Sequence, residues 1–401
     1  MIPSAIHLFL TVLASSVLLA PSALCAQRAD TLRMRLAWEV VEGAHPIADS
    51  LGVLTGIALD AKGNVYASDG SSAKIWVLDA TGRSQRGIGR KGKGPGEFDH
   101  PTGIATGPDG KLYVRNMSQV ARFKEDAVTG RLSRYDSAFT GPMYADWMNT
   151  RATRFHANGN LYHVGEGVVD LRKRAMMYQV FSPSGALVDS VAVPPFANMP
   201  SSTARYAISA NGGRMVRGVS HAPFAPQPVW DITPRGTLLL GDGTSYRLRE
   251  QDRTGRVLRE FTRSVTPERI PADERRDSLS ALRARIDSIP VPLDRVEGMP
   301  PEVRALTLPE VFPAYSAAYA APDGRIWVRR WLKASDVRTI FDVFEADGRY
   351  SRVVELPRII ASFPTPVLSL DGIAAVGIDP ETGANTILRF IAPKASAPPR
   401  R

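Results

Sequence analysis

The sequence predicts an all-β fold, a six-bladed β-propeller of four-stranded antiparallel blades that is closed by an N-terminal strand and carries a helical insertion. Three observations predict it: a turn motif recurs six times, its closest copies lie just under fifty residues apart, and the chain contains 33 Gly and 31 Pro. So many turn-forming residues favour short strands over long helices. The chain has 401 residues, of which 44% are hydrophobic, and this composition excludes a disordered or collagen-like protein.

Each copy of the motif is a short apolar run, a turn ending in Gly, and a second β-rich run. The clearest copies reach their turns at Gly63, before Val65 and Tyr66, and at Gly110. Glycine supplies the positive φ that such a turn needs, and a neighbouring Asp or Asn tightens it. The six turn glycines are Gly63, Gly110, Gly159, Gly236, Gly324 and Gly372, separated by 47, 49, 77, 88 and 48 residues. Each copy therefore predicts a hairpin, and most are followed by a second strand and Gly turn.

The shared period has the size of a propeller blade, whose sheet buries both faces only when neighbouring blades stack on it. The two long intervals are therefore single repeats that contain insertions, at about 194–228 and 266–310. In the first insertion, residues 208–216 resemble another turn between strands, so seven blades is the alternative. In the second, an apolar stripe with helical spacing predicts a helix. The stripe consists of Leu279, Leu282, Ile286 and Ile289.

The two ends of the repeat region predict how the ring closes. Residues 32–40 form a lone strand before the first unit, and residues 386–390 end the last unit. We expect them to pair, because an unpaired edge strand invites aggregation. The predicted organisation is thus a closing segment at 27–49, the propeller at 50–392 and a disordered tail at 393–401.

The N-terminal segment predicts export. Residues 1–26 contain no charged side chain, and residues 6–20 form an apolar run too short to span a bilayer. We expect a signal peptide cleaved after Cys25 or Ala26 and a periplasmic or extracellular protein without a transmembrane span; an N-terminal membrane anchor is the alternative. Cys25 is the sole cysteine. The mature chain would therefore contain no disulfide, thiolate metal site or Cys nucleophile.

The net charge of the chain indicates what class of partner it binds. The formal net charge is +10, which suits a protein, peptide or anionic polymer of the cell envelope as partner. The sequence contains no zinc-finger spacing, RNP-type motif or long basic run, so we expect no nucleic acid. We expect a monomer.

Residues 83–104 contain a glycine-rich link, then Phe98, two residues, Pro101 and a β-rich run. This tract resembles the NHL-type and TolB-like six-bladed β-propellers, and most of all exported bacterial propellers of unassigned function. The resemblance is strong in the first two blades and loose in the other four. It implies that the first strand of each blade lines the channel. It also implies that the links between blades share one face with the loops joining second to third strands.

That face would carry the candidate ligand-binding residues. They are Arg90, Lys91, Lys93, His100, Arg115, Asn116, Glu166, Asp242, Arg329, Arg330 and Trp331; His163 lies among them. Binding residues concentrate on loops held by a rigid scaffold, and Arg-rich mouths suit carboxylates, phosphates or anionic sugars. We therefore predict an exported, non-catalytic scaffold that binds a protein, peptide or anionic glycan. The alternative is a metal-dependent lactonase or lyase, with the metal at the channel mouth.

The chemistry of the candidate residues favours binding over catalysis. The inner segments 56–58, 103–105 and 316–318 offer no carboxylate to a metal. His100, His156 and His163 lie in different parts of the sequence. Residues 87–96 lack the Gly-Lys-Ser/Thr ending of a phosphate loop, and the chain has no Gly-x-Ser-x-Gly elbow. We therefore predict no catalytic residue, metal or cofactor and leave enzymatic activity open.

Overall fold

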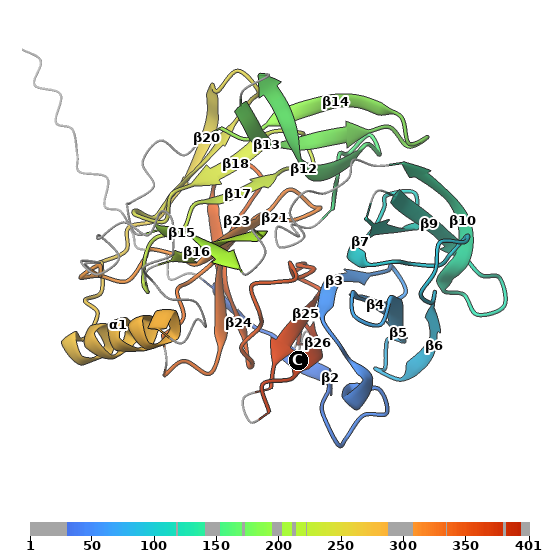
Figure 1. Ribbon diagram of the computed structural model, residues 1–401, viewed down its shortest axis with the longest axis horizontal. Coiled ribbons are helices and arrows are strands. Elements are labelled where there is room, and N and C mark those ends of the chain that lie inside the picture. Colours follow the sequence, from blue (N-terminus) through green and yellow to red (C-terminus); the bar gives the residue numbers. More distant parts are fainter. Residues whose placement is uncertain are drawn as a thin grey trace, which may run out of the picture.

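The computed structural model is a ring of six β-sheet blades (Figure 1). It describes residues 30–117, 119–140, 153–170, 173–194, 203–210, 214–221, 223–287, 308–333, 335–379 and 382–393. The predicted signal peptide and nearly all of the predicted tail lie outside these ranges.

Blades 1 to 5 are antiparallel sheets whose four strands follow one another along the chain. Blade 1 contains β3 (Leu54–Leu59), β4 (Val65–Asp69), β5 (Lys74–Leu78) and β6 (Ser84–Ile88). Blade 2 contains β7 (Pro101–Thr106), β8 (Leu112–Asn116), β9 (Gln119–Glu125) and β10 (Leu132–Thr140). Blade 3 contains β11 (Arg154–Phe155), β12 (Leu161–Asp170), β13 (Lys173–Phe181) and β14 (Leu187–Ala192). Blade 4 contains β17 (Val229–Ile232), β18 (Leu238–Gly241), β19 (Arg247–Gln251) and β20 (Val257–Thr262), and blade 5 contains β21 (Ala317–Ala320), β22 (Ile326–Arg329), β23 (Thr339–Phe344) and β24 (Tyr350–Leu356).

Blade 6 closes the ring with strands from both ends of the chain. β25 (Gly372–Ile378) pairs with β26 (Asn385–Ile391), and β26 pairs with β2 (Arg35–Val40). Isolated bridges from Ile360 and Val367 to β25 place residues 360–367 in the innermost position. The predicted pairing of the N-terminal strand with the last unit is confirmed. The strand preceding it, β1 (Asp30–Arg33), runs parallel to β24 of blade 5, so the N-terminal segment connects two blades.

The hydrophobic core lies between the blades. Six clusters of buried side chains each join two neighbouring blades. The cluster that completes the ring packs Leu54 and Trp76 of blade 1 against Ala374 and Ile387 of blade 6. No blade can bury these faces alone, so stacking and closure stabilise the fold together.

The repeated turns account for the regular blade geometry. Five of the six predicted turn glycines have positive φ, between +73° at Gly110 and +89° at Gly159. The second turns also carry left-handed glycines, such as Gly82 and Gly255. The exception is Gly372, which begins β25. In blade 6 the inner segment pairs through two isolated bridges, and its turn does not require that conformation.

The two long intervals contain structure outside the blades. In the first, β15 (Thr203–Ala210) and β16 (Arg214–His221) form a separate two-stranded sheet. Two strands do not make a blade, so the seven-blade alternative is wrong. The second contains α1 (Ala272–Asp287), which lies at the periphery of the molecule (Figure 1) and buries Leu282. Ile289 of the predicted stripe lies outside the described residues. A short 3-10 helix, η1 (Ala48–Ser50), precedes blade 1.

Candidate functional site

The antiparallel blades give the propeller two different ends. At the turn end, the first strand of each blade turns into the second. At the link end, one blade connects to the next, and second strands turn into third strands. The residues predicted to bind a ligand belong to the link end. The structure places a cavity at the turn end.

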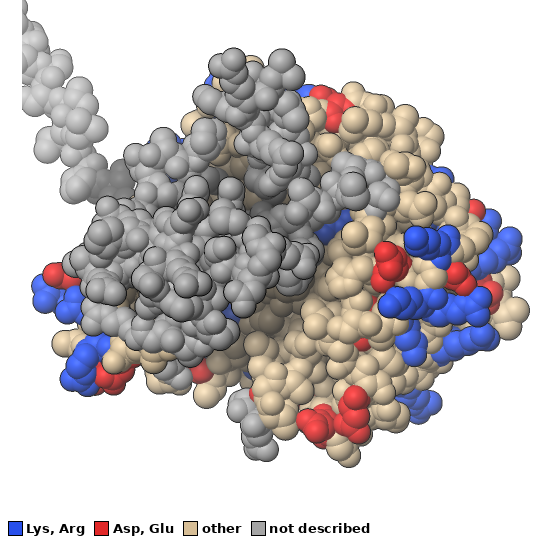
Figure 2. Space-filling view, in the orientation of Figure 1, with Lys and Arg blue, Asp and Glu red and all other residues tan. Residues whose placement is uncertain are grey.

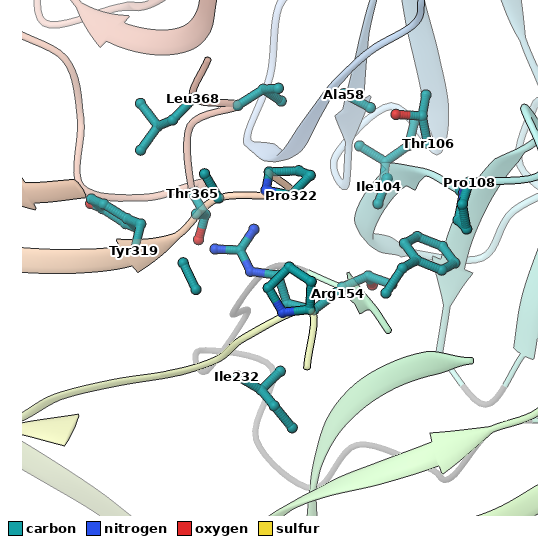
Figure 3. Close-up of a pocket in the computed structure, with 18 of the residues that line it drawn as sticks. Ala58, Ile104, Thr106, Pro108, Arg154, Ile232, Tyr319, Pro322, Thr365 and Leu368 are labelled. Carbon is teal, nitrogen blue, oxygen red and sulfur yellow. The ribbon is translucent and has the colours of Figure 1, made fainter. Parts of the chain in front are cut away.

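The cavity has a volume of about 350 Å³ and lies in the central channel (Figure 3). Its walls are the turn-end parts of the innermost strands and the turns after them, including Ile104, Ile232, Tyr319 and Leu368. Two of its lining residues, Pro108 and Pro322, are exposed to solvent. Ligand sites in proteins are concave, mostly apolar and hold a few polar groups, and their volumes begin near 300 Å³. This cavity meets those criteria.

Arg154 of β11 is the cationic group in the cavity wall. Figure 3 shows its guanidinium group pointing into the cavity, on the side of Thr365 and Pro322. Arg154 Nη2 lies 2.7 Å from Asp231 Oδ2, and Nε donates to Oδ1 at 3.2 Å. Burial by itself lowers the pKa of Arg154, but attraction to Asp231 raises it overall. The guanidinium is therefore charged while its side chain is only 17% exposed.

Asp231 connects three blades. It belongs to β17 of blade 4, and it binds Arg154 of blade 3 and accepts a hydrogen bond from the backbone N–H of Ala320 in blade 5, at 3.0 Å. The N–H of Ile232 donates to the same carboxylate at 2.9 Å. Together with Arg154, these two uncharged donors stabilise the negative charge of a carboxylate that is held out of water.

His156 follows β11 and also lines the cavity. The backbone N–H of Asn158 donates to its Nδ1 at 3.0 Å. In the neutral imidazole the proton is therefore on Nε2, because a ring nitrogen that accepts a hydrogen bond carries none. Asp60 and Thr233 hold the equivalent place in the turns of blades 1 and 4 and accept the same type of bond. His156 thus serves as a turn-forming residue and lines the same cavity as Arg154.

The predicted residues of the first link are exposed. Arg90 forms an ion pair with Glu97 at 2.8 Å, and its side chain is 83% exposed. Lys91 bridges Phe98 through its backbone, and both Lys91 and Lys93 point to solvent. Hydrogen bonds from Gly94 and Arg90 lower the pKa of Glu97. Figure 2 shows Lys and Arg gathered over β6, β9 and β10, where this link leaves blade 1.

Three other predicted residues hold the chain at the link end. Asn116 Oδ1 accepts hydrogen bonds from the backbone N–H groups of Asp99 and His100, at 3.0 and 2.9 Å. His100 Nδ1 lies 2.9 Å from the carbonyl oxygen of Gly70 in blade 1. Asp242 is exposed and accepts from the N–H and hydroxyl of Thr244.

Two predicted arginines are buried. Arg115, 2% exposed, donates from Nε to Thr102 Oγ1 at 2.7 Å. Arg329, 3% exposed, donates from Nη2 to the carbonyl oxygen of Ile360 at 2.6 Å and from Nη1 to Ser362 Oγ at 3.0 Å. Burial lowers the pKa of Arg329. Burial, followed by the charge of Arg115, also lowers the pKa of His163 far below its usual value, so that ring is neutral at neutral pH.

The remaining predicted residues belong to other clusters. Arg330 donates twice to Asp342, at 2.7 and 3.0 Å. The ring of Trp331 lies 6.4 Å from that of Phe224, which also packs against Phe312. Glu166 is in β12, opposite Met176. The eleven residues are therefore spread around the link end and do not converge on one point.

Sequence reasoning missed Arg154 and Asp231 and gave His156 no role in binding. Arg154 and Asp231 are 77 positions apart, and blades 3 and 4 match the repeat only loosely. An available signal was a charged residue in each of two innermost strands, at the position where blades 1 and 2 have Ala58 and Ala105. In the part of the chain that the structure describes, no three His, Cys, Asp or Glu side chains are grouped as metal ligands. Nor does any described helix have the length and apolar character needed to cross a membrane.

The fold and cavity define a six-bladed β-propeller with a ligand-sized space in its channel. No family model and no curated protein matches the chain. Among solved structures it is similar to virginiamycin B lyase from Staphylococcus aureus, with 11% identity, 90% of this chain and 100% of that chain covered, and a TM-score of 0.41. It is also similar to the aldose sugar dehydrogenase of Streptomyces coelicolor in its PQQ-bound form, with 14% identity, coverage of 90% and 98%, and a TM-score of 0.40. A protein of unknown function from Bacteroides caccae has 10% identity, coverage of 75% and 86%, and a TM-score of 0.34. Likenesses this distant carry no information about function.

Proposed function

We propose that the protein is an exported, non-catalytic propeller of the NHL type that binds an anionic polymer of the cell envelope through the first link. The basic stripe, defined as Arg86, Arg90, Lys91 and Lys93, carries this proposal. All four side chains are exposed. Between Asp79 and Glu97 the chain contains no acidic residue. Such a run of one sign attracts a polyanion over several ångströms.

The link also has a fixed shape, which supports recognition. Backbone hydrogen bonds join Gly92 N–H to Phe98 O at 3.0 Å and Phe98 N–H to Arg90 O at 2.9 Å. Phe98 is fully buried and packs 6.0 Å from the ring of Phe123 in blade 2. The cations are thus presented from an anchored loop, which lowers the entropy lost on binding. The Phe98 and Pro101 positions agree with the NHL-type link.

Retention on immobilised heparin, used as a sulfated polyanion, tests the proposal. The triple variant Arg86→Gln, Lys91→Gln and Lys93→Gln removes three charges without removing the Arg90–Glu97 pair. At about 0.5–1 kcal/mol for each exposed charge, we expect affinity to fall roughly tenfold to a hundredfold. The matched control, Arg256→Gln with Arg276→Gln and Arg349→Gln, lowers the net charge equally at other exposed sites. Equal losses in both variants would contradict a specific binding stripe.

A further inference from the structure

The turn-end cavity has a chemistry that the basic stripe does not explain. Its walls are largely apolar, from Ile57, Ile104, Phe155, Ile232, Val367 and Leu368 among others. Its volume of about 350 Å³ is that of about twelve water molecules at about 30 Å³ each. Water in such a space gains little from apolar walls, so an apolar ligand that displaces it is favoured.

The polar groups in the cavity wall determine which polar group a ligand can carry at the end opposite its apolar part. Among the described residues, Arg154 hydrogen-bonds through Nε and Nη2, both to Asp231, and Nη1 is the nitrogen left for a ligand. His156 keeps its Nε2 donor because Nδ1 accepts from Asn158. Both groups donate, so the ligand must accept. A carboxylate accepts from an arginine and a second donor at once.

The charge balance limits that acceptor to a single negative charge. Arg154 is the charged lining residue among those described, and Asp231 already offsets part of its charge. The backbone N–H groups of Ile232 and Ala320 take up part of the Asp231 charge, so Arg154 keeps a positive field toward the cavity. A doubly charged phosphate would lose more hydration free energy on entering the cavity than its attraction to this single arginine would return.

We propose that the turn-end cavity binds a small monocarboxylate with an apolar tail. Its carboxylate lies against Arg154 Nη1 and His156 Nε2, and its tail lies among the apolar side chains of the channel. This site is independent of the polyanion site at the opposite end of the propeller. The arginine is held in place before the ligand arrives, because Asp231 fixes its position. Such preorganisation reduces the cost of binding.

Calorimetric titration of the full mature chain with butanoate, octanoate and dodecanoate tests this site. We expect the wild type to bind at least one member of the series and to bind the matching alkylamine at least tenfold more weakly. Arg154→Lys keeps a cation beside Asp231 but removes the planar fork, and we expect at least a tenfold loss of carboxylate affinity. His156→Asn retains an acceptor for the Asn158 N–H and removes the Nε2 donor. We expect it to weaken binding severalfold.

The matched control is Arg325→Lys, which changes the same residue type at a turn-end position outside the cavity, where Arg325 pairs with Asp323 and Glu345. It should bind the carboxylate as the wild type does, and thermal unfolding should show that each variant is folded. The triple variant of the basic stripe should also bind normally. The proposal is overturned if no carboxylate in the series binds the wild type, if amines bind equally well, or if both Arg154→Lys and His156→Asn bind unchanged.

Discussion

The two ends of the propeller use charged side chains in different ways. At the link end, Asn116, Arg329 and Arg330 bind the protein's own backbone and carboxylates, which fixes long connections between blades. At the turn end the buried carboxylate of Glu250 is bound in the same way, by Arg235 and Arg259. What the turn end has in addition is a pair in the wall of a cavity, Arg154 with Asp231. A charged residue near a propeller mouth is therefore evidence of binding only when the chain does not already use it.

The largest expected effect is at the link end. Asp342 is fully buried and accepts hydrogen bonds from Arg263, Arg330, Tyr246 and Tyr350. Asp342→Asn leaves two arginines without their counter-charge, and we expect a loss of about 3–5 kcal/mol in the free energy of unfolding. Urea denaturation measures it. The control, Asp242→Asn, removes an exposed carboxylate and should cost less than about 0.5 kcal/mol. Similar values for both variants would mean that the link-end charges do not hold the fold.

That contrast also explains which parts could be predicted from the sequence. The turn glycines and the closing strand follow local rules: a hairpin needs left-handed residues, and a ring needs its last edge paired. The pairing of β1 with β24 follows no local signal, because Asp30 meets Arg352 across nearly the whole chain.

The candidate site shows the same limit. The sequence identified Arg115 and Arg329 by residue type and approximate position, but the burial of each depends on side chains from other strands. It could not identify the Arg154–Asp231 pair, because that pair exists only once blades 3 and 4 are side by side. Exposed residues of a local loop, such as Lys91 and Lys93, were within reach of sequence reasoning, since their exposure depends on that loop alone.

At the turn end, substitutions of two glycines distinguish the cost of the backbone conformation from the cost of packing. Gly110 and Gly236 have φ of +73° and +77°, but a Cβ on Gly110 meets no atom within 4 Å, whereas one on Gly236 lies 2.5 Å from the hydroxyl of Tyr162. Gly110→Ala should therefore cost about 1–2 kcal/mol of unfolding free energy from the left-handed backbone alone. Gly236→Ala should cost about 1–3 kcal/mol more, because Tyr162 is buried and cannot move freely. Equal costs in urea denaturation would show that the turns next to the cavity tolerate rearrangement.

The smallest expected effect compares two tyrosines whose carboxylate partners differ in exposure. Burial, together with a hydrogen bond to a carboxylate, raises the pKa of both Tyr113 and Tyr350 to about 12. The partner of Tyr113 is Asp109, which is exposed at the turn end, and the partner of Tyr350 is the buried Asp342. An unfolded tyrosine titrates near pH 10. The folded state therefore holds each proton more tightly, and its stability is complete below pH 10 and falls as the pH rises toward 12.

Urea midpoints measured from pH 9 to 12 for the wild type, Tyr113→Phe and Tyr350→Phe isolate each contribution. The difference between the wild type and each variant should shrink across that window. In about 1 M salt, where the Debye length is about 3 Å, the change linked to Tyr113 should diminish, because water and ions reach Asp109. The change linked to Tyr350 should persist, because Asp342 is enclosed by Arg263 and Arg330. An equal response to salt at both positions would mean that the two carboxylates have similar access to solvent, and the distinction between a carboxylate enclosed by the protein's own arginines and one open to solvent would fail at these residues.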